Sequence, residues 1–324
     1  MDKLIVKNKK IFITGGAGFL GKKLIERLYN ENEIIVYSRD EAKHYSLKAL
    51  YPNIHFILGD IRDKDLLTRS SRGSNIGIFA ASLKQISACD EYPEEALKTI
   101  VNGAINSKFA AIENNFESAT FISTDKSRAA TTIYGSLKFA AGEQFILKNH
   151  LEKESKTKLS TIIYGNVLNS TGSVIPMIWQ AINTNSKLTL FSNEMTRFLI
   201  TADEALDLIF KGLQIDGASI IPKSKSAKIS DLFEIYKEKF NLNFIIGKPR
   251  VGEKIHEILA AKEEMQRISN SACGSFLILR PKFSKNIPIF EGFGRGEDYS
   301  SKDCLISKYE LEKLLEKYEY FRPQ

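Results

Sequence analysis

The feature that most constrains the fold is a regular alternation of two hydrophobic patterns along the first half of the chain. From residue 9 to about residue 166, short runs rich in β-branched and aromatic residues alternate with segments whose apolar residues recur every three or four positions. This alternation predicts strand–helix–strand units, and hence a parallel sheet. We expect strands at 10–14, 33–37, 54–58, 76–80, 119–124 and 159–165, with helices between them, for example at 21–30 and 94–115.

The second half of the chain lacks this alternation. Helical periodicity returns at 174–183, 202–213, 230–240 and 307–321, with short strands near 188–191 and 198–201. Single cores stop growing at about 250–300 residues, so a chain of 324 residues is expected to form two lobes. The sequence therefore predicts an α/β protein with a doubly wound, Rossmann-type parallel sheet in 1–166. We expect a smaller α/β lobe in 167–324, with chain crossings back to the first domain.

Composition excludes several classes of protein. Hydrophobic residues make up 43% and charged residues 26% of the chain, and no apolar run approaches the about 18 residues of a membrane span. The apolar run near the N-terminus is too short for a signal peptide, so we expect a cytoplasmic location and no membrane partner. The net charge of +7 comes from lysines spread along the chain, which predicts no nucleic-acid partner. The three cysteines and four histidines show no metal-ligand spacing, so no metal site is expected.

A glycine-rich turn separates the first strand from the first helix. Gly15, Gly18 and Gly21 follow one another at three-residue spacing. Such a turn brings the backbone close to a pyrophosphate and directs the free N–H groups of the helix start, here at Phe19 and Leu20, toward it. The strand, the turn and the helix all lie where the motif requires them. The sequence therefore predicts a dinucleotide-binding site in residues 1–166.

The end of the second strand bears on the choice of dinucleotide. Ser38 and Arg39 come first and Asp40 follows, which favours the 2′-phosphate of NADP over the ribose diol of NAD. NAD stays open, because Arg39 could be a surface cation and Asp40 the cap of the next helix. Asp60, after the third strand, suits the adenine amino group or the cap of the next helix. The candidate cofactor-binding residues are Gly15, Gly18, Phe19, Leu20, Gly21, Ser38, Arg39, Asp60, Ile61, Ala80, Ala81 and Lys138.

Tyr134 and Lys138 form a candidate acid/base pair. They lie four residues apart, one helical turn, just past the strand predicted at 119–124. A phenol with a pKa of about 10 becomes a useful base at neutral pH when an ammonium and an oxidised nicotinamide stabilise the phenolate. The pair suits an alcohol–ketone interconversion, and Ser123 and Thr124 could hydrogen-bond the same substrate oxygen.

Several motifs together resemble one family over nearly the whole chain. They include TGGAGFLG, GDIRD, AASLKQISACDEYPEEALKT, STDK with YGSLK, YGNV with GSVIP, MTRFLIT and RVGEKIHE. The chain resembles the extended short-chain dehydrogenase/reductases, and among them the inverting UDP-N-acetylglucosamine 4,6-dehydratases. The resemblance implies a UDP-sugar substrate, a tightly bound nicotinamide cofactor and a homo-oligomer, either a dimer or a hexamer.

The resemblance also implies a reaction and its catalytic residues, Thr124, Asp125, Lys126, Tyr134 and Lys138. Tyr134 would take the proton of the sugar 4-hydroxyl, Lys126 the proton of C5, and Asp125 would protonate the departing 6-hydroxyl. The expected product is a UDP-4-keto-6-deoxy sugar, inverted at C5, for surface or flagellar glycan biosynthesis. The implied candidates for substrate binding are Lys84, Asn166, Arg197, Arg250, Glu253 and Glu257.

The sequence departs from the family pattern at several positions near these motifs. Ile100 replaces the usual Asn of one helix, and Thr171 stands where an Arg normally precedes GS. Three alternatives therefore stay open. The chain could be a paralogue that converts a 5,6-unsaturated UDP-sugar to the 4-keto-6-deoxy product, a UDP-sugar 4-epimerase, or a non-catalytic dinucleotide-sensing protein.

Overall fold

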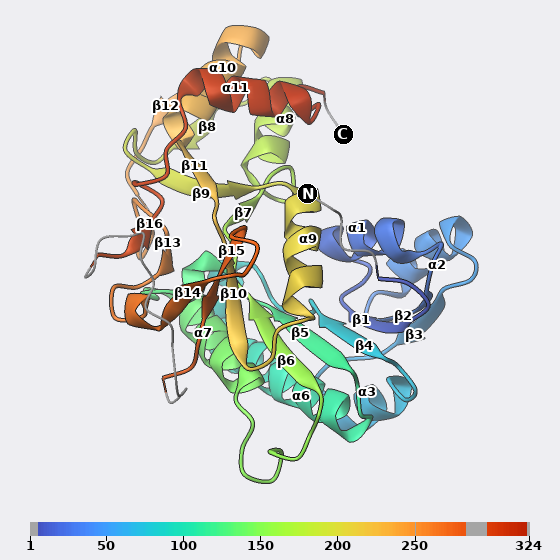
Figure 1. Ribbon diagram of the computed structural model, residues 1–324. Helices are drawn as coiled ribbons and strands as arrows, with labels where there is room; N and C mark the ends of the chain where they lie inside the picture. Colours follow the sequence, from blue (N-terminus) through green and yellow to red (C-terminus); the bar gives the residue numbers. More distant parts are fainter. Residues whose placement is uncertain (1–5, 250, 283–296, 323–324) are drawn as a thin grey trace.

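The computed structural model describes residues 6–249, 251–282 and 297–322, and it is built around one large sheet (Figure 1). The strand order is β14-β15-β10-β6-β5-β4-β1-β2-β3. The strands are β1 (Lys10–Thr14), β2 (Glu33–Ser38), β3 (His55–Leu58), β4 (Ile76–Phe79), β5 (Ser118–Ile122), β6 (Lys158–Ile162), β10 (Ala218–Pro222), β14 (Ile268–Asn270) and β15 (Phe276–Leu279). Neighbours from β3 to β10 run parallel, whereas β15 and β14 are antiparallel additions at one edge. The prediction of a doubly wound parallel sheet is confirmed.

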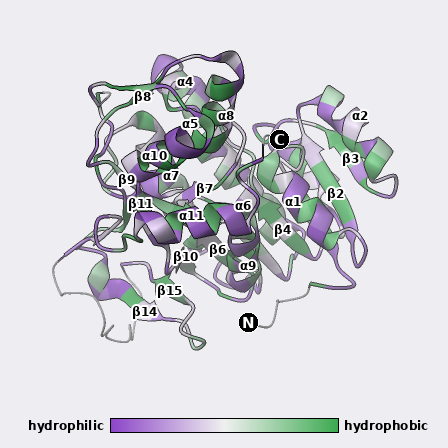
Figure 2. Cartoon of the chain, turned by 90° about the horizontal axis from the view of Figure 1, so that it is seen from above, coloured by the Kyte–Doolittle hydropathy of each residue, from purple (hydrophilic) through white to green (hydrophobic). Residues whose placement is uncertain are grey.

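Helices cover both faces of this sheet because alternate strand residues point to opposite sides. Ile11 and Ile13 belong to the apolar cluster that includes residues of α1, α2 and α9, whereas Phe12 belongs to the opposite cluster, with residues of α3 to α7. Figure 2 shows hydrophobic residues along β2 and β4 and mixed polarity along α1. The helices are α1 (Phe19–Leu28), α2 (Glu41–Leu50), α3 (Lys64–Ser70), α4 (Ile86–Glu91), α5 (Pro93–Leu97), α6 (Gly103–Glu113), α7 (Ile133–Ile146) and α9 (Ala202–Gly212).

The helix predicted at 94–115 is present over Pro93–Glu113, and the backbone stays helical at the junctions between its three parts. A π-helix, Lys98–Asn102, separates α5 from α6. A π-helix inserts an extra residue per turn, and hydrophobic periodicity does not reveal it. Two strands are shorter than predicted, since β5 ends at Ile122 and β6 at Ile162. Ser123, Thr124 and residues 163–165 therefore lie beyond the regular strands.

The later part of the chain forms a second apolar core beyond the carboxyl ends of the parallel strands (Figure 1). This core packs α8 (Val174–Thr184), α10 (Ile229–Phe240) and α11 (Lys308–Lys317) around Trp179 and Tyr236. Three small sheets accompany the helices: β7 (Asn166–Val167), β9 (Thr196–Ile200) and β11 (Lys225–Lys228); β8 (Leu188–Leu190) and β12 (Phe244–Ile246); β13 (Ile258–Ala260) and β16 (Tyr299–Ser300). Within the described ranges, no helix has the length and apolar character needed to cross a bilayer.

Ion pairs on α1 and after β5 tie the later chain to the parallel sheet. Arg27 on α1 pairs with Asp203 and Asp207 on α9. Arg128 follows a short 3-10 helix, η2 (Asp125–Ser127), and is almost completely buried. Its guanidinium lies 2.6 Å from Glu264, just before the 3-10 helix η3 (Met265–Arg267). This buried pair fixes the segment around η3 against the end of β5.

We expect Arg128→Met to lower the free energy of unfolding by about 3 kcal/mol, because Glu264 would stay buried without its main partner. Urea titration followed by circular dichroism measures the change. Arg322→Met is the control, because Arg322 pairs with Glu319 on the surface and should contribute little. Equal stability of the two variants would show that the buried pair does not hold the segment.

Candidate active site

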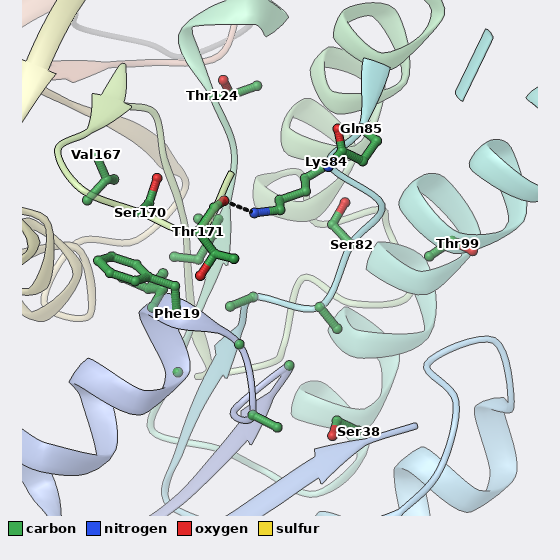
Figure 3. Close-up of a pocket in the computed structure, with 18 of the residues that line it drawn as sticks. Phe19, Ser38, Ser82, Lys84, Gln85, Thr99, Thr124, Val167, Ser170 and Thr171 are labelled. Atoms are coloured by element: carbon green, nitrogen blue, oxygen red, sulfur yellow. Dashed lines mark hydrogen bonds between the residues drawn. The ribbon is translucent and has the colours of Figure 1, made fainter. Parts of the chain in front are cut away.

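A cavity of about 1150 Å³ lies at the carboxyl ends of the parallel strands. Ligands of doubly wound proteins bind at this edge, where the strand order reverses, here between β1 and β4. The lining comes from loops after β1, β2, β3, β4, β5 and β6, from α7, and from the loop at 170–173. Figure 3 labels residues that line this cavity, among them Phe19 at the start of α1, Ser38 at the end of β2 and Thr124 after β5.

Most residues predicted for the site line this one cavity. The residues brought together are Gly15, Gly18, Phe19, Leu20, Gly21, Ser38, Arg39, Asp60, Ile61, Ala80, Ala81, Lys84, Thr124, Asp125, Lys126, Tyr134, Lys138 and Asn166. Three predicted residues, Arg197, Glu253 and Glu257, are not part of its lining. Arg250 lies outside the described residues.

The glycine turn has the shape that a pyrophosphate requires. Gly15 adopts a φ of +69°, and a Cβ placed there would lie 2.9 Å from the backbone of Ala81. A Cβ at Gly21 would lie 2.3 Å from the backbone of Gly16, so only glycine lets α1 start this close to the turn. Gly18 is the N-cap of α1 and provides no side-chain cap. This cradle fits the pyrophosphate of a dinucleotide.

At the end of β2, Asp40 has a structural partner. Its carboxylate accepts a hydrogen bond from the backbone N–H of Lys43 and caps α2, one of the two roles that the sequence left open. Arg39 is more than half exposed, with its guanidinium 3.6 Å from Asp60. The Oγ of Ser38 lies 2.6 Å from Nε2 of the buried His44. Ser38 and Arg39 line the cavity at the end of β2, together with Asp40 and Lys43.

Asp60 does not cap the helix after β3. The cap of α3 is Asp63, which accepts from the backbone of Leu66. Asp60 accepts hydrogen bonds from the backbone N–H and the guanidinium of Arg62. Burial opposes ionisation of Asp60, but these hydrogen bonds outweigh it and lower the pKa of the carboxyl. Asp60 therefore presents a negative charge at the edge of the cavity.

Tyr134 and Lys138 lie on the buried face of α7, which Thr132 caps by accepting from the N–H of Gly135. The ammonium of Lys138 donates to the carbonyl of Ile122 at 2.8 Å, and burial lowers the pKa of Lys138 to about 7. Burial raises the pKa of Tyr134 to about 12, and the positive charge of Lys126 acts against this rise. The positive charge of Lys126 therefore favours the phenolate, and the expected contribution of Lys138 stays a prediction.

Asp125 and Lys126 occupy η2, directly after β5. Asp125 is completely buried, and its Oδ1 accepts from the hydroxyl of Thr124 at 2.9 Å and lies 3.3 Å from Nζ of Lys126. Burial raises the pKa of Asp125, and the charge of Glu257 adds to the rise, although Lys126 opposes it. Burial opposes the ammonium of Lys126, but Asp125 and Glu257 outweigh it and raise its pKa. The structure thus pairs a buried carboxyl group of raised pKa with a lysine of raised pKa.

Arg197, Glu253 and Glu257 lie behind Lys126 because Thr196 on β9 forms an isolated β-bridge with His256. The guanidinium of Arg197 donates to two backbone carbonyls and to Glu253 at 3.1 Å. Its hydrogen-bonding groups are therefore directed at the protein. Contact of these three residues with a UDP-sugar stays a prediction.

Sequence reasoning did not assign a role to several residues that line the cavity. Thr99 reaches it on the π-helix, and the other missed residues include Ser82, Gln85, Tyr164, Ser170 and Ser173. Nζ of Lys84 donates to the backbone carbonyl of Thr171 at 2.6 Å, as Figure 3 shows. The hydroxyl-rich run at 170–173, directly before α8, was the signal available in the sequence. The described residues contain no cluster of three His, Cys, Asp or Glu side chains able to hold a metal ion.

Comparisons with known proteins place this cavity in a family. Residues 11–275 match the family described as polysaccharide biosynthesis protein. The chain is 34% identical to a UDP-N-acetylglucosamine 4,6-dehydratase (inverting) of Campylobacter jejuni, over 79% of this chain and 78% of that protein. It is 30% identical to a UDP-glucose 4-epimerase of Rickettsia akari, over 98% of both proteins.

Solved structures show the same fold. The X-ray structure of Pen from Bacillus thuringiensis superposes with a TM-score of 0.87 at 26% identity, over 98% of this chain and 99% of that chain. DesIV, a dTDP-glucose 4,6-dehydratase from Streptomyces venezuelae solved with NAD and TYD bound, superposes with a TM-score of 0.64 at 18% identity, over 76% of this chain and 86% of that chain. The chain therefore belongs to the polysaccharide biosynthesis family, within the extended short-chain dehydrogenase/reductases, as its motifs predicted.

Proposed function

We propose that this protein is a UDP-N-acetylhexosamine 4,6-dehydratase that inverts C5 and releases a UDP-4-keto-6-deoxy sugar. The observation that carries the proposal is the fully buried Asp125, whose pKa burial raises, beside Lys126 and in the same cavity as Tyr134. The Campylobacter relative is named for a reaction of this type. The product would serve surface or flagellar glycan biosynthesis in the cytoplasm.

Tyr134 is the group that handles the proton of the sugar 4-hydroxyl. When bound, a nicotinamide would supply the hydride chemistry that the reaction needs. Tyr134 takes the 4-hydroxyl proton as C4 becomes a ketone, and the positive charge of Lys126 favours the phenolate that this step needs. The hydroxyl of Thr124, which lines the same wall, can hold the oxygen at C4 in place.

Asp125 and Lys126 would carry out the elimination. The new ketone acidifies the C5 proton, which Lys126 takes in its neutral form and returns as an ammonium. Asp125 donates its proton to the 6-hydroxyl, which leaves as water. The Oδ2 of Asp125 is buried and has no hydrogen-bond partner among the described residues, so it is the oxygen that can hold this proton.

NADP is the cofactor that we propose, tightly bound, with NAD as the alternative. Ser38 and Arg39 offer a hydroxyl and a positive charge, and the cap formed by Asp40 engages its carboxylate with α2. The glycine cradle would hold the pyrophosphate, and Asp60 the adenine amino group. The cofactor is regenerated in each cycle, so it need not leave.

The UDP-sugar would bind where Lys84 and Asn166 line the cavity. Oδ1 of Asn166 is buried and has no hydrogen-bond partner among the described residues, so it is available to a donor on the ligand. We expect the working protein to be a homo-oligomer, a dimer or a hexamer, as the family resemblance implies.

A 4-epimerase is the second candidate, because the Rickettsia relative bears that name. An epimerase needs Tyr134 and the cofactor, but it has no leaving group for Asp125 to protonate. A paralogue acting on a 5,6-unsaturated UDP-sugar would use the same residues as the full dehydratase. The reaction itself therefore has to be measured.

Proton NMR of UDP-N-acetylglucosamine, incubated in D₂O with the purified protein and no added cofactor, tests the proposal. We expect a new methyl signal from C6 and deuterium at C5, and we expect NADP among the nucleotides released by denaturation. A C4 epimer without a methyl signal would establish the epimerase instead. With no change at all, the 5,6-unsaturated sugar is the next substrate to test.

Two sets of variants separate redox from elimination. Tyr134→Phe should reduce formation of reduced nicotinamide at least about 100-fold with little change in UDP-sugar affinity. The double variant Asp125→Asn with Lys126→Ala should still oxidise C4, seen as nicotinamide absorbance, but form no methyl product. Normal product formation by the double variant would show that this pair is structural.

Gly15→Ala should yield folded protein with little bound dinucleotide, because the added Cβ would lie 2.9 Å from the backbone of Ala81. Chromatography of the nucleotide released per chain measures the loss. Gly274→Ala is a matched control, since Gly274 has the same φ of +69° but nothing near the added Cβ. If Gly15→Ala retained as much nucleotide as the control, the cradle would not be the cofactor site.

A further inference from the structure

A line of four charged side chains runs from the cavity into the later chain. Lys126 Nζ lies 3.3 Å from Oδ1 of Asp125 and 3.1 Å from Oε1 of Glu257. Nε of Arg197 lies 3.7 Å from the same Oε1 of Glu257. The order along the line is therefore Asp125, Lys126, Glu257 and Arg197, and only the first two line the cavity.

The two carboxyl groups of this line differ in their surroundings. Glu257 lies between two cations, Lys126 and Arg197, and it is 3% exposed. Asp125 contacts one cation and the hydroxyl of Thr124, and it is completely buried. A buried carboxylate needs positive charge to stay ionised, so Glu257 is the better site for the negative charge.

The directions of the pKa shifts agree with this geometry. Burial opposes ionisation of Glu257, but the charges of Lys126 and Arg197 outweigh it and lower the pKa of Glu257. Burial raises the pKa of Asp125, and the negative charge of Glu257 adds to the rise. Tyr134 and Lys254 are further titratable groups near this line, and the ammonium of Lys254 donates to the carbonyl of Arg128. Glu253 pairs with the outer side of Arg197.

We propose that Glu257 is a positioning residue that sets the protonation of the Asp125–Lys126 pair. Its fixed negative charge behind Lys126 makes the pair hold two protons before the sugar binds, one on the carboxyl group of Asp125 and one that keeps Lys126 an ammonium. Without Glu257, Asp125 and Lys126 would form a simple ion pair that holds one. This inference rests on the proposed dehydration, because that reaction needs a carboxyl proton for the leaving 6-hydroxyl. It also gives Glu257 a role other than binding the UDP-sugar.

The proton count of the elimination fits this arrangement. The C6–O bond breaks as Asp125 Oδ2 gives its proton to the departing oxygen, and the electrons of the C5–H bond form the C5=C6 double bond. Lys126 receives the C5 proton, so its ammonium group must first release a proton to water. Activity should therefore rise with pH as the pair loses its first proton and fall when it loses the second.

Infrared spectroscopy of the protein without sugar tests the charge assignment directly. At neutral pH we expect a carbonyl band from a protonated carboxyl group that shifts when aspartate carries a carbon-13 label in its side-chain carboxyl. The band should be absent from Asp125→Asn, and also from Glu257→Gln, where Asp125 ionises beside Lys126. The proposal would be overturned if the wild-type protein lacked the band, or if the band did not shift when aspartate carries the label.

The pH profile of C5 hydrogen exchange provides the kinetic test. Removing the negative charge of Glu257 lowers the pKa of both Asp125 and Lys126, so Glu257→Gln should move both limbs of the profile to lower pH by about one unit or more. Glu257→Asp keeps the charge and should return the profile toward that of the wild type. Glu263→Gln removes the same charge from an exposed neighbour of Lys262 and should leave the profile in place.

An unmoved profile in Glu257→Gln would contradict the positioning role. The two tests also separate this inference from the proposed function, since the infrared band needs no substrate. A wild-type protein that shows the labelled band but no C5 exchange would retain the charge assignment and contradict the dehydratase.

Discussion

The common direction of the seven strands from β3 to β10 is the constraint on which the site depends. Parallel strands bring all their carboxyl ends to one edge, so loops from distant parts of the sequence meet there. The glycine turn, Asp60, Asp125 and Asn166 each follow a different strand and nevertheless line one cavity. The catalytic helix α7 adds Tyr134 because it starts directly beyond this edge.

A second principle of the site is that burial selects the charge state of each group. Burial raises the pKa of Asp125 against the opposing charge of Lys126, whereas Asp125 and Glu257 outweigh burial and raise the pKa of Lys126. Lys138, buried beside a backbone carbonyl, has its pKa lowered to about 7. Burial and neighbouring charges therefore shift the pKa of several groups in one cavity, a pattern that is common at functional sites.

The sequence predicted the first six strands because each is a self-contained apolar run bounded by turns, and it predicted the cavity because the motifs follow those strands. It did not predict β10, β14 and β15, whose pairing depends on the rest of the sheet. The π-helix was not predicted, because one extra residue in a single turn changes the spacing of the apolar residues very little. The position of Glu257 behind Lys126 depends on the bridge between Thr196 and His256, a contact between segments 60 residues apart.

The addition of β10 next to β6 has a consequence for how this protein can be divided. A fragment ending near residue 166 would leave β6 as an unpaired edge, and it would lose α9, which covers Ile11 and Ile13 together with α1. An open strand edge beside an uncovered apolar face favours aggregation. Residues 1–166 are therefore not a transplantable module, and a chimera that exchanges the later part of the chain has to carry β10 and α9 with them.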